Sequence, residues 1–106
     1  MAIFGYGRVS TSQQDTENQR LELEQAGWTF DFWFTDVVSG KVPAVQRKEF
    51  SEMLSKIRDG ETLVVAKLDR LGRDAIDVLQ TVRTLADRNI KVIVHQLGTK
   101  IGRAHV

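Results

Sequence analysis

Short apolar stretches alternate along this chain with helix-like stretches, and this alternation constrains the fold more than any other feature. Four stretches have the length and residue types of buried strands, at 3–9, 29–35, 62–66 and 91–95. The intervening stretches 16–26, 50–57 and 76–88 are predicted to be helices. The order β-α-β-α-β-α-β with short links favours an α/β fold, with a mostly parallel four-stranded sheet and flanking helices.

Local signals set the predicted boundaries of these elements. Thr16 and Gln19 have the spacing of a capping box, and Gly27 is a natural stop for the helix that follows. An apolar face at i, i+3, i+4 and i+7 begins at Phe50, and Gly60 is expected to end that helix. Residues 36–46 contain the single proline and are interpreted as a loop.

Composition excludes several classes of protein. The 106 residues fit one domain, and an apolar fraction of 42% is too high for a disordered chain. The absence of cysteine excludes disulfides and thiolate chemistry, and two distant histidines do not form a metal cluster of the usual kind. No apolar run approaches the roughly 20 residues of a membrane span, so we expect a cytoplasmic protein without a membrane partner. The net charge of +1 is low for a DNA-binding domain.

Polar residues follow three of the predicted strands. In a parallel sheet, functional groups gather at the carboxyl ends of the strands. The residues placed there by the prediction are Arg8, Ser10, Asp36, Arg47, Lys67, Asp69, Arg70 and Arg73. A helix beginning near Arg70 would bring Arg73 onto the same face.

This set of residues suits phosphoryl transfer. Guanidinium groups stabilise the negative charge that develops on a phosphodiester under attack, and a serine hydroxyl can act as the nucleophile. The base that would activate Ser10 is not evident, since arginine is a poor base and neither histidine is suitably placed.

Simpler interpretations remain open at this point. A serine before a helix is more often an N-cap than a nucleophile, and Asp69 with Arg70 is more often a surface ion pair. A small phosphatase or nucleotide-binding domain is a further alternative, although the chain has neither a P-loop nor a cysteine nucleophile.

Three motifs resemble those of the serine site-specific recombinases, the resolvase/invertase family. The stretch Tyr6–Gln14 (YGRVSTSQQ) with Gln19 resembles the family's N-terminal signature, and Leu68–Arg73 (LDRLGR) resembles the second signature. Asp36–Gly40 and Arg47 fall in the family's mobile active-site loop. The resemblance covers residues 1 to about 97 and implies a resolvase-like catalytic domain.

The resemblance implies a DNA recombinase that needs neither metal, ATP nor another cofactor. Ser10 would attack a DNA phosphodiester, forming a 5′-phosphoserine link and freeing a 3′-hydroxyl, and reversal would rejoin the strands. Arg8, Arg70 and Arg73 would hold the phosphate, and Asp69 would assist protonation of the leaving oxygen. The implied supporting residues are Arg47, Gln19, Gln14, Asp36 and Lys67.

The implied partners are DNA and further copies of the chain, as a homodimer and a synaptic tetramer, in a bacterial, plasmid, phage or transposon context. The family's dimer helix and DNA-reading helix-turn-helix are expected to be absent from this sequence. Residues 1–100 are interpreted as the catalytic domain, and 101–106 (IGRAHV) as a non-native tail resembling a translated sequencing adapter. We therefore expect the 106-residue chain alone to be inactive. The alternative is a truncated remnant that binds DNA or full-length partner subunits.

Overall fold

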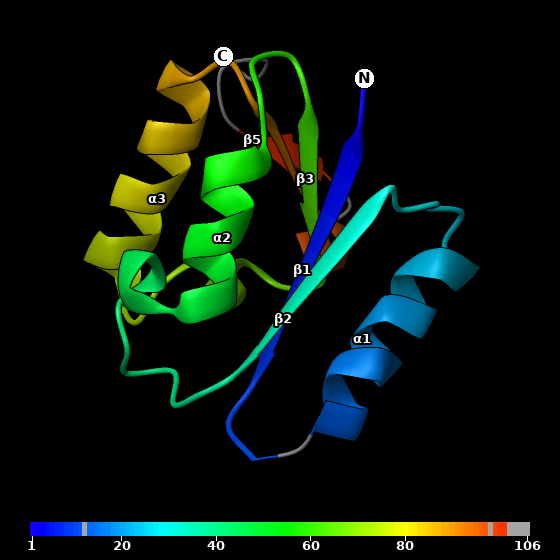
Figure 1. Ribbon diagram of the computed structural model, residues 1–106, viewed down its shortest axis with the longest axis vertical. Coiled ribbons are helices and arrows are strands. Elements are labelled where there is room, and N and C mark those ends of the chain that lie inside the picture. The colour runs from blue at the N-terminus through cyan, green and yellow to red at the C-terminus, as the bar shows by residue number, and fades with distance from the viewer. Residues whose placement is uncertain (12, 98, 102–106) are drawn as a thin grey trace.

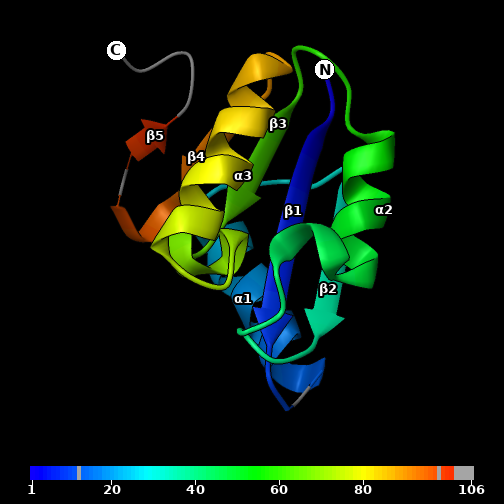
Figure 2. The same cartoon turned by 90° about the vertical axis from the view of Figure 1, so that its left-hand side faces the viewer.

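The computed structural model describes residues 1–11, 13–97 and 99–101. Its strands lie in the order β2-β1-β3-β4-β5, and three α-helices and three short 3₁₀ helices lie within these ranges. The strands are β1 (Ile3–Val9), β2 (Phe32–Val37), β3 (Thr62–Val65), β4 (Lys91–Val94) and β5 (Thr99–Ile101). The helices are α1 (Gln13–Gln25), η1 (Ala44–Gln46), α2 (Lys48–Lys56), η2 (Leu68–Leu71), α3 (Ala75–Asp87) and η3 (His95–Leu97). Helices α2 and α3 cover one face of the sheet and α1 covers the other (Figures 1 and 2).

The four predicted strands are all present and all parallel, which confirms the predicted fold class. The prediction missed β5, which pairs antiparallel with β4 and places Ile101 opposite Val92. A three-residue strand that depends on a neighbour for its pairing carries little signal of its own in sequence. Residues 102–106 lie outside the described residues, so the interpretation of the tail stays a prediction.

Alternation along β1 divides its side chains between the two faces of the sheet. Phe4 and Tyr6 are buried in the core beneath α2 and α3. Gly5 faces the α1 side, where a Cβ atom would overlap the ring of Trp33 and approach Phe30 to 2.7 Å. A glycine is therefore needed at this position, because the two aromatic rings pack directly on the backbone of β1.

The two faces have cores of different size. The larger core lies between the sheet and the helices α2 and α3, and Phe50, Met53 and Leu85 contribute to it from these helices. The smaller core lies against α1, where Leu23 packs with Val64 of β3. Burial on both faces explains why the central strands are apolar throughout rather than alternating.

Several predicted boundaries were wrong. Helix α1 begins at Gln13 rather than beside Thr16, which is buried within the helix, although Gly27 does end it with a φ of +106°. Helix α2 ends at Lys56, before Gly60, because the chain turns extended at Ile57 and the Arg88 guanidinium donates to two carbonyls at that end. Strand β2 begins at Phe32 rather than Thr29 and extends to Val37, so it includes residue 36, which was predicted to lie in the loop. Within the described ranges, no helix combines the length and apolar character needed to cross a membrane.

Candidate active site

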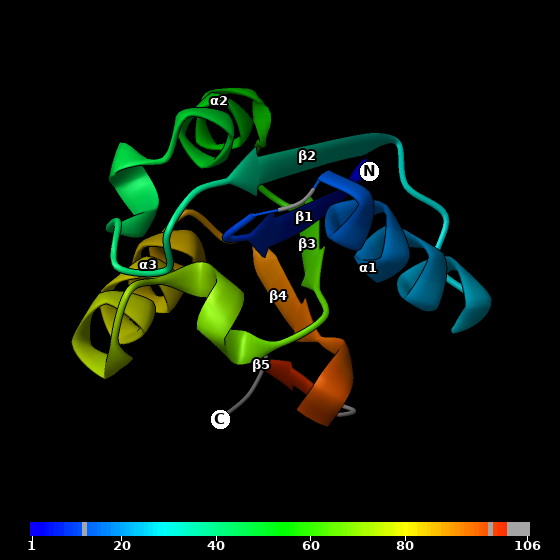
Figure 3. The ribbon, with the colours of Figure 1, turned by 90° about the horizontal axis from the view of Figure 1, so that it is seen from below.

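The carboxyl ends of the parallel strands meet at one edge of the sheet, which Figure 3 views directly. Ser10 follows β1 immediately and is exposed. The loop 38–47 follows β2, and η2 follows β3 after two residues. Three separate strand ends therefore deliver polar side chains to this edge, as the strand order requires.

Arg8 is held at this edge by contacts from two segments, the loop after β2 and helix α1. Its Nη1 donates to the carbonyl of Val38 at 3.0 Å, which ties the end of β1 to the loop after β2. The Gln19 side chain donates from α1 to the Arg8 carbonyl at 3.1 Å. A Cβ at Gly40 would lie 3.3 Å from Nη2 of Arg8, so the loop passes close over the guanidinium. These contacts fix the backbone two residues before Ser10.

Arg47 is the most deeply buried charged residue among those described, with 1% of its surface exposed. Its Nη1 donates to the carbonyl of Arg70 at 2.7 Å and lies 3.5 Å from the hydroxyl of Tyr6. Its Nε donates to the carbonyl of Val42 at 3.1 Å. Arg47 therefore connects the loop 38–47 to η2 and to β1, at a place where burial of a charge requires several acceptors.

Asp36 supports this arrangement from β2. The Tyr6 hydroxyl donates to its Oδ2 at 2.8 Å, and the backbone N–H groups of Glu49 and Phe50 donate to the carboxylate at 2.9 and 3.0 Å. The carboxylate thus satisfies the first N–H groups of α2, which a helix cannot satisfy itself. Burial raises the pKa of Tyr6 above its ordinary value, so its hydroxyl remains a proton donor to Asp36.

Arg70 and Asp69 form the ion pair that the simpler interpretation anticipated. Nη1 of Arg70 lies 2.7 Å from Oδ1 of Asp69. The two side chains differ in environment, because that of Arg70 is 15% exposed and that of Asp69 is 72% exposed. Asp69 thus contacts Arg70 from the solvent side, where an isolated pair contributes little stability.

Three guanidinium groups gather at this edge with incomplete hydrogen bonding. Arg8 Nε, Arg47 Nη2 and Arg70 Nε are buried and have no hydrogen-bond partner within the described part of the chain. Burial lowers the pKa of Arg8, and the positive charges of Arg70 and Arg47 lower it further. Buried donors without acceptors are rare in proteins, and here they belong to groups that repel one another. An anion with several oxygens, such as a phosphodiester, would satisfy both requirements.

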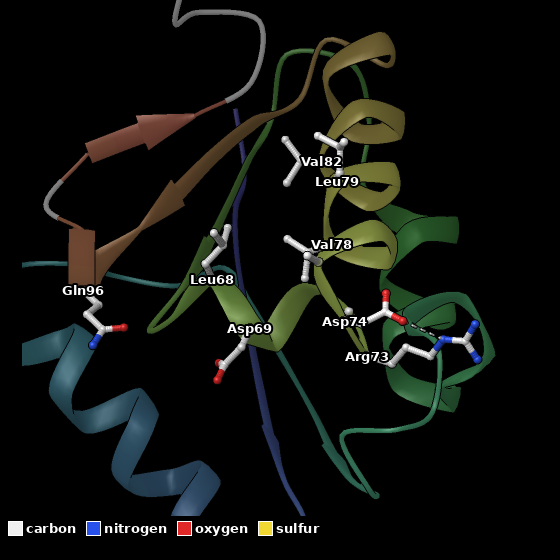
Figure 4. A pocket seen from close by; sticks show the side chains of 10 residues that line it. Leu68, Asp69, Arg73, Asp74, Val78, Leu79, Val82 and Gln96 are labelled. Carbon is white, nitrogen blue, oxygen red and sulfur yellow. Dashed lines mark ion pairs between the residues drawn. The ribbon is translucent and has the colours of Figure 1, made fainter.

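Three other predicted residues lie differently. Arg73 does not share a helical face with Arg70, because η2 ends at Leu71 and α3 begins only at Ala75. The Arg73 side chain is half exposed and pairs with Asp74 at 3.5 Å, and Figure 4 shows it pointing away from η2. Lys67 is exposed ahead of η2. Gln14 is the second residue of α1, but its side chain lies outside the described residues.

Sequence reasoning missed two residues that organise this edge. Tyr6 links Asp36 and Arg47, and its position two residues before Arg8 on the same strand was the available signal. Asp77 accepts hydrogen bonds from the backbone of Ala44 and of Arg73. Nothing in the local sequence of α3 distinguishes Asp77 from an ordinary acid in the first turn of a helix.

Comparison with known proteins gives a consistent result. The family described as "Resolvase, N terminal domain" matches residues 3–105. The Tn2501 transposon resolvase of Escherichia coli is 44% identical over 98 residues, which cover 91% of this chain and 50% of that protein. The DNA-invertase of Escherichia phage P1 is 43% identical over 88 residues, covering 83% of this chain and 45% of that protein. The chain therefore spans about half the length of these curated relatives.

The solved structures agree with the sequence relatives. A serine recombinase from Sulfolobus solfataricus superimposes with a TM-score of 0.69 at 32% identity, covering 89% of this chain and 67% of that structure. The family match extends over nearly the whole chain and includes the residues that converge at the carboxyl edge of the sheet. The chain therefore belongs to the resolvase N-terminal domain family, the family of the serine recombinases.

Proposed function

We propose that this chain is the catalytic domain of a site-specific recombinase that breaks and rejoins DNA through Ser10. One observation carries the proposal. Three arginines, Arg8, Arg47 and Arg70, retain buried N–H groups without partners in the described part of the chain, at the edge of the sheet where the exposed Ser10 follows β1. A DNA phosphodiester supplies the oxygens that these donors lack, and it is the group that a serine hydroxyl would attack.

In the proposed reaction, Ser10 Oγ forms a bond to phosphorus as the bond from phosphorus to the DNA 3′-oxygen breaks. The Ser10 proton is released, and the departing oxygen takes up a proton to become a 3′-hydroxyl. Asp69 is our candidate for assisting that protonation, since it is exposed beside Arg70. The three arginines stabilise the charge on the phosphoryl oxygens as it develops. Rejoining is the reverse step, and the covalent link conserves the energy of the broken bond.

The remaining site residues have supporting roles in this proposal. Gln19 holds the Arg8 carbonyl, and Asp36 holds Tyr6 and the start of α2. Arg73 is exposed and would contact the phosphate only after its side chain turns, which free rotation on the surface permits. Lys67 and Gln14 would contribute through the DNA backbone, where lysine and amide groups commonly bind.

We further propose that the active form contains several copies of the chain, a homodimer that pairs into a tetramer. Support comes from α3, where Ile76 is 70% exposed and Leu79 is 57% exposed. Beside them lies a mainly apolar groove of about 730 Å³, which Figure 4 shows with Leu68 and Val82 facing it. Exposed apolar surface of this kind is typical of a contact between proteins. The proposed setting is the bacterial cytoplasm, on plasmid, phage or transposon DNA.

The test joins residues 1–100 to the remaining half of the Tn2501 resolvase and supplies the recombination site of that transposon. We expect a protein–DNA adduct that survives denaturation by detergent, with the 5′-phosphate attached to Ser10. The Ser10→Ala variant should form no adduct, whereas Ser55→Ala on the exposed face of α2 should form it at the normal rate. An adduct that persists in Ser10→Ala would show that the nucleophile is another residue. A chimera that binds the site without forming an adduct would favour the inactive remnant instead.

A further inference from the structure

One carboxylate oxygen of Asp77 joins two segments that are distant from each other in sequence. Its Oδ2 accepts a hydrogen bond from the backbone N–H of Ala44 at 3.0 Å and another from that of Arg73 at 2.9 Å. Ala44 is completely buried in the loop after β2, and Arg73 follows η2. A single atom of α3 therefore fixes the position of both segments.

These two segments carry two of the three clustered arginines. Arg47 lies three residues after Ala44, and Arg70 lies three residues before Arg73. The segments touch directly at one further point, where Arg47 Nη1 donates to the Arg70 carbonyl at 2.7 Å. We call the two hydrogen bonds accepted by Asp77 Oδ2 the Asp77 bridge. The bridge and the direct bond together set the distance between the two segments that carry these guanidinium groups.

The bridge differs from ordinary capping of a helix. Asp74 caps α3 by accepting from the N–H of Asp77 at 2.8 Å, so Asp77 occupies the third position of the helix. In a capping box, the acid at that position reaches back to the N–H of the cap residue itself. Here its carboxylate reaches past the cap residue to Arg73 and across to Ala44. Because Asp74 already caps the helix, the Asp77 carboxylate is left to hold the two segments together.

Close packing keeps this geometry in place. A Cβ at Gly72 would lie 2.6 Å from the Val78 nitrogen and 2.9 Å from Oδ2 of Asp77. The chain after η2 thus rests directly on the first turn of α3, which only a glycine permits. The N-terminal end of α3 also favours a negative charge on Asp77.

We propose that Asp77 is a positioning residue for catalysis, which sets the spacing of Arg47 and Arg70 around the scissile phosphate. The proposal rests on the proposed function of the arginine cluster. Asp77 acts through backbone N–H groups rather than by touching DNA. Because one oxygen accepts both hydrogen bonds, the side-chain carbonyl of asparagine can take its place, whereas alanine cannot.

The experiment records the side-chain Nε–H signals of the arginines by NMR in the 106-residue chain, first alone and then during titration with inorganic phosphate. Without phosphate, Asp77→Ala should shift the signals of Arg47 and Arg70, and Asp77→Asn should restore them. With phosphate present, Asp77→Ala should weaken phosphate binding about tenfold. This is less than the roughly hundredfold loss of rate that a misplacement of about 1 Å causes in an enzymatic reaction. Asp77→Asn should bind phosphate within about twofold of the wild type, on the same reasoning.

The matched control is Asp74→Ala, which removes the cap of the same helix but leaves the bridge. It should lower stability while leaving the Arg47 and Arg70 signals unchanged. Only the Arg73 signal should shift, because Asp74 pairs with Arg73 Nε. Ala44→Pro tests the bridge from its other end, without altering α3. Pro43 has φ −56° and ψ 146°, a conformation that a residue before proline can adopt, so the backbone accepts this substitution. The proline ring removes the Ala44 donor and occupies the place of its hydrogen bond, so it displaces the Asp77 carboxylate from this end of the bridge. It should shift the Arg47 signal as Asp77→Ala does.

Two outcomes overturn the positioning role. In the first, the Arg47 and Arg70 signals are unshifted in both Asp77→Ala and Ala44→Pro. In the second, Asp74→Ala shifts the Arg47 and Arg70 signals as much as Asp77→Ala does, which would mean that Asp77 acts only by stabilising the start of the helix. Failure of the proposed function has a different signature. In that case the wild type would show no phosphate-dependent change at Arg8, Arg47 or Arg70, while the phosphate-free comparison of the variants would still test the bridge.

Discussion

Replacing Asp36 with alanine should destabilise the protein more than removal of a carboxylate usually does. Asp36 is 3% exposed and accepts three hydrogen bonds, from the hydroxyl of Tyr6 and from the N–H groups of Glu49 and Phe50. The bonds from Tyr6 and Phe50 are buried, so water cannot readily replace the lost acceptor. The substitution leaves these donors in place and removes only their partner.

The expected size follows from these contacts. A buried donor left without an acceptor costs about 1–3 kcal/mol, and loss of a helix cap costs about 1 kcal/mol. Two buried donors and the start of α2 together give a loss of about 3–7 kcal/mol in the free energy of unfolding. A domain of this size is stable by about 5–15 kcal/mol, so the variant should lose a large part of its stability.

Urea unfolding followed by circular dichroism measures this loss. Asp36→Asn, which keeps one acceptor oxygen, should lose less than Asp36→Ala. Asp59→Ala, at an exposed position, should stay within about 0.5 kcal/mol of the wild type. A loss below about 1 kcal/mol in Asp36→Ala, with an unchanged slope against urea, would refute the reasoning, because it would mean that the donors find other acceptors at little cost.

Two further predictions concern titration and assembly. The single tyrosine, Tyr6, has a pKa raised by burial above the ordinary 10.0, so its stabilising effect is fully present below about pH 10 and is lost as the pH rises through the folded value. Absorbance at 295 nm should therefore show no ionisation near pH 10 while the protein stays folded, and a transition there in folded protein would contradict the burial argument. Leu79→Ser should reduce self-association in sedimentation velocity, because it removes apolar surface that is 57% exposed, whereas Gln80→Ser beside it should not. Equal association of both variants would place the contact elsewhere.

The sheet and the convergence of its carboxyl ends could be predicted because they depend on local patterns. Four apolar runs with helical stretches between them admit few arrangements, and the run that ends at Val9 fixes where Ser10 emerges. The start of helix α1 was harder to predict, because few of its positions in the described part are buried. Thr16 also has the residue type and spacing of an N-cap, although it lies within the helix. Its true start at Gln13 therefore does not follow from the capping pattern alone.

The sequence predicts which residues belong to the site better than it predicts how these residues are arranged. Arg8 lies near the end of β1 and Arg70 comes five residues after β3, so the strand pattern places both. Arg47 comes ten residues after β2, and its almost complete burial depends on the path of the loop across Val42, Tyr6 and Arg70. Arg73 was placed beside Arg70 by assuming a helix there, and the extended Gly72 breaks that relationship.

The position of β1 between β2 and β3 has a consequence for how the site opens. Phe4, Gly5 and Tyr6 of β1 pair with strands on both edges, so this part of the strand leading to Ser10 should exchange with solvent only through near-global unfolding. In the loop 38–47, the backbone bonds of Val42, Gln46 and Arg47 each span three residues and can break one at a time. Hydrogen exchange should therefore divide the site into a slow half that carries the nucleophile and a faster half that carries Arg47. A mild denaturant would release the second half while the first stays in place.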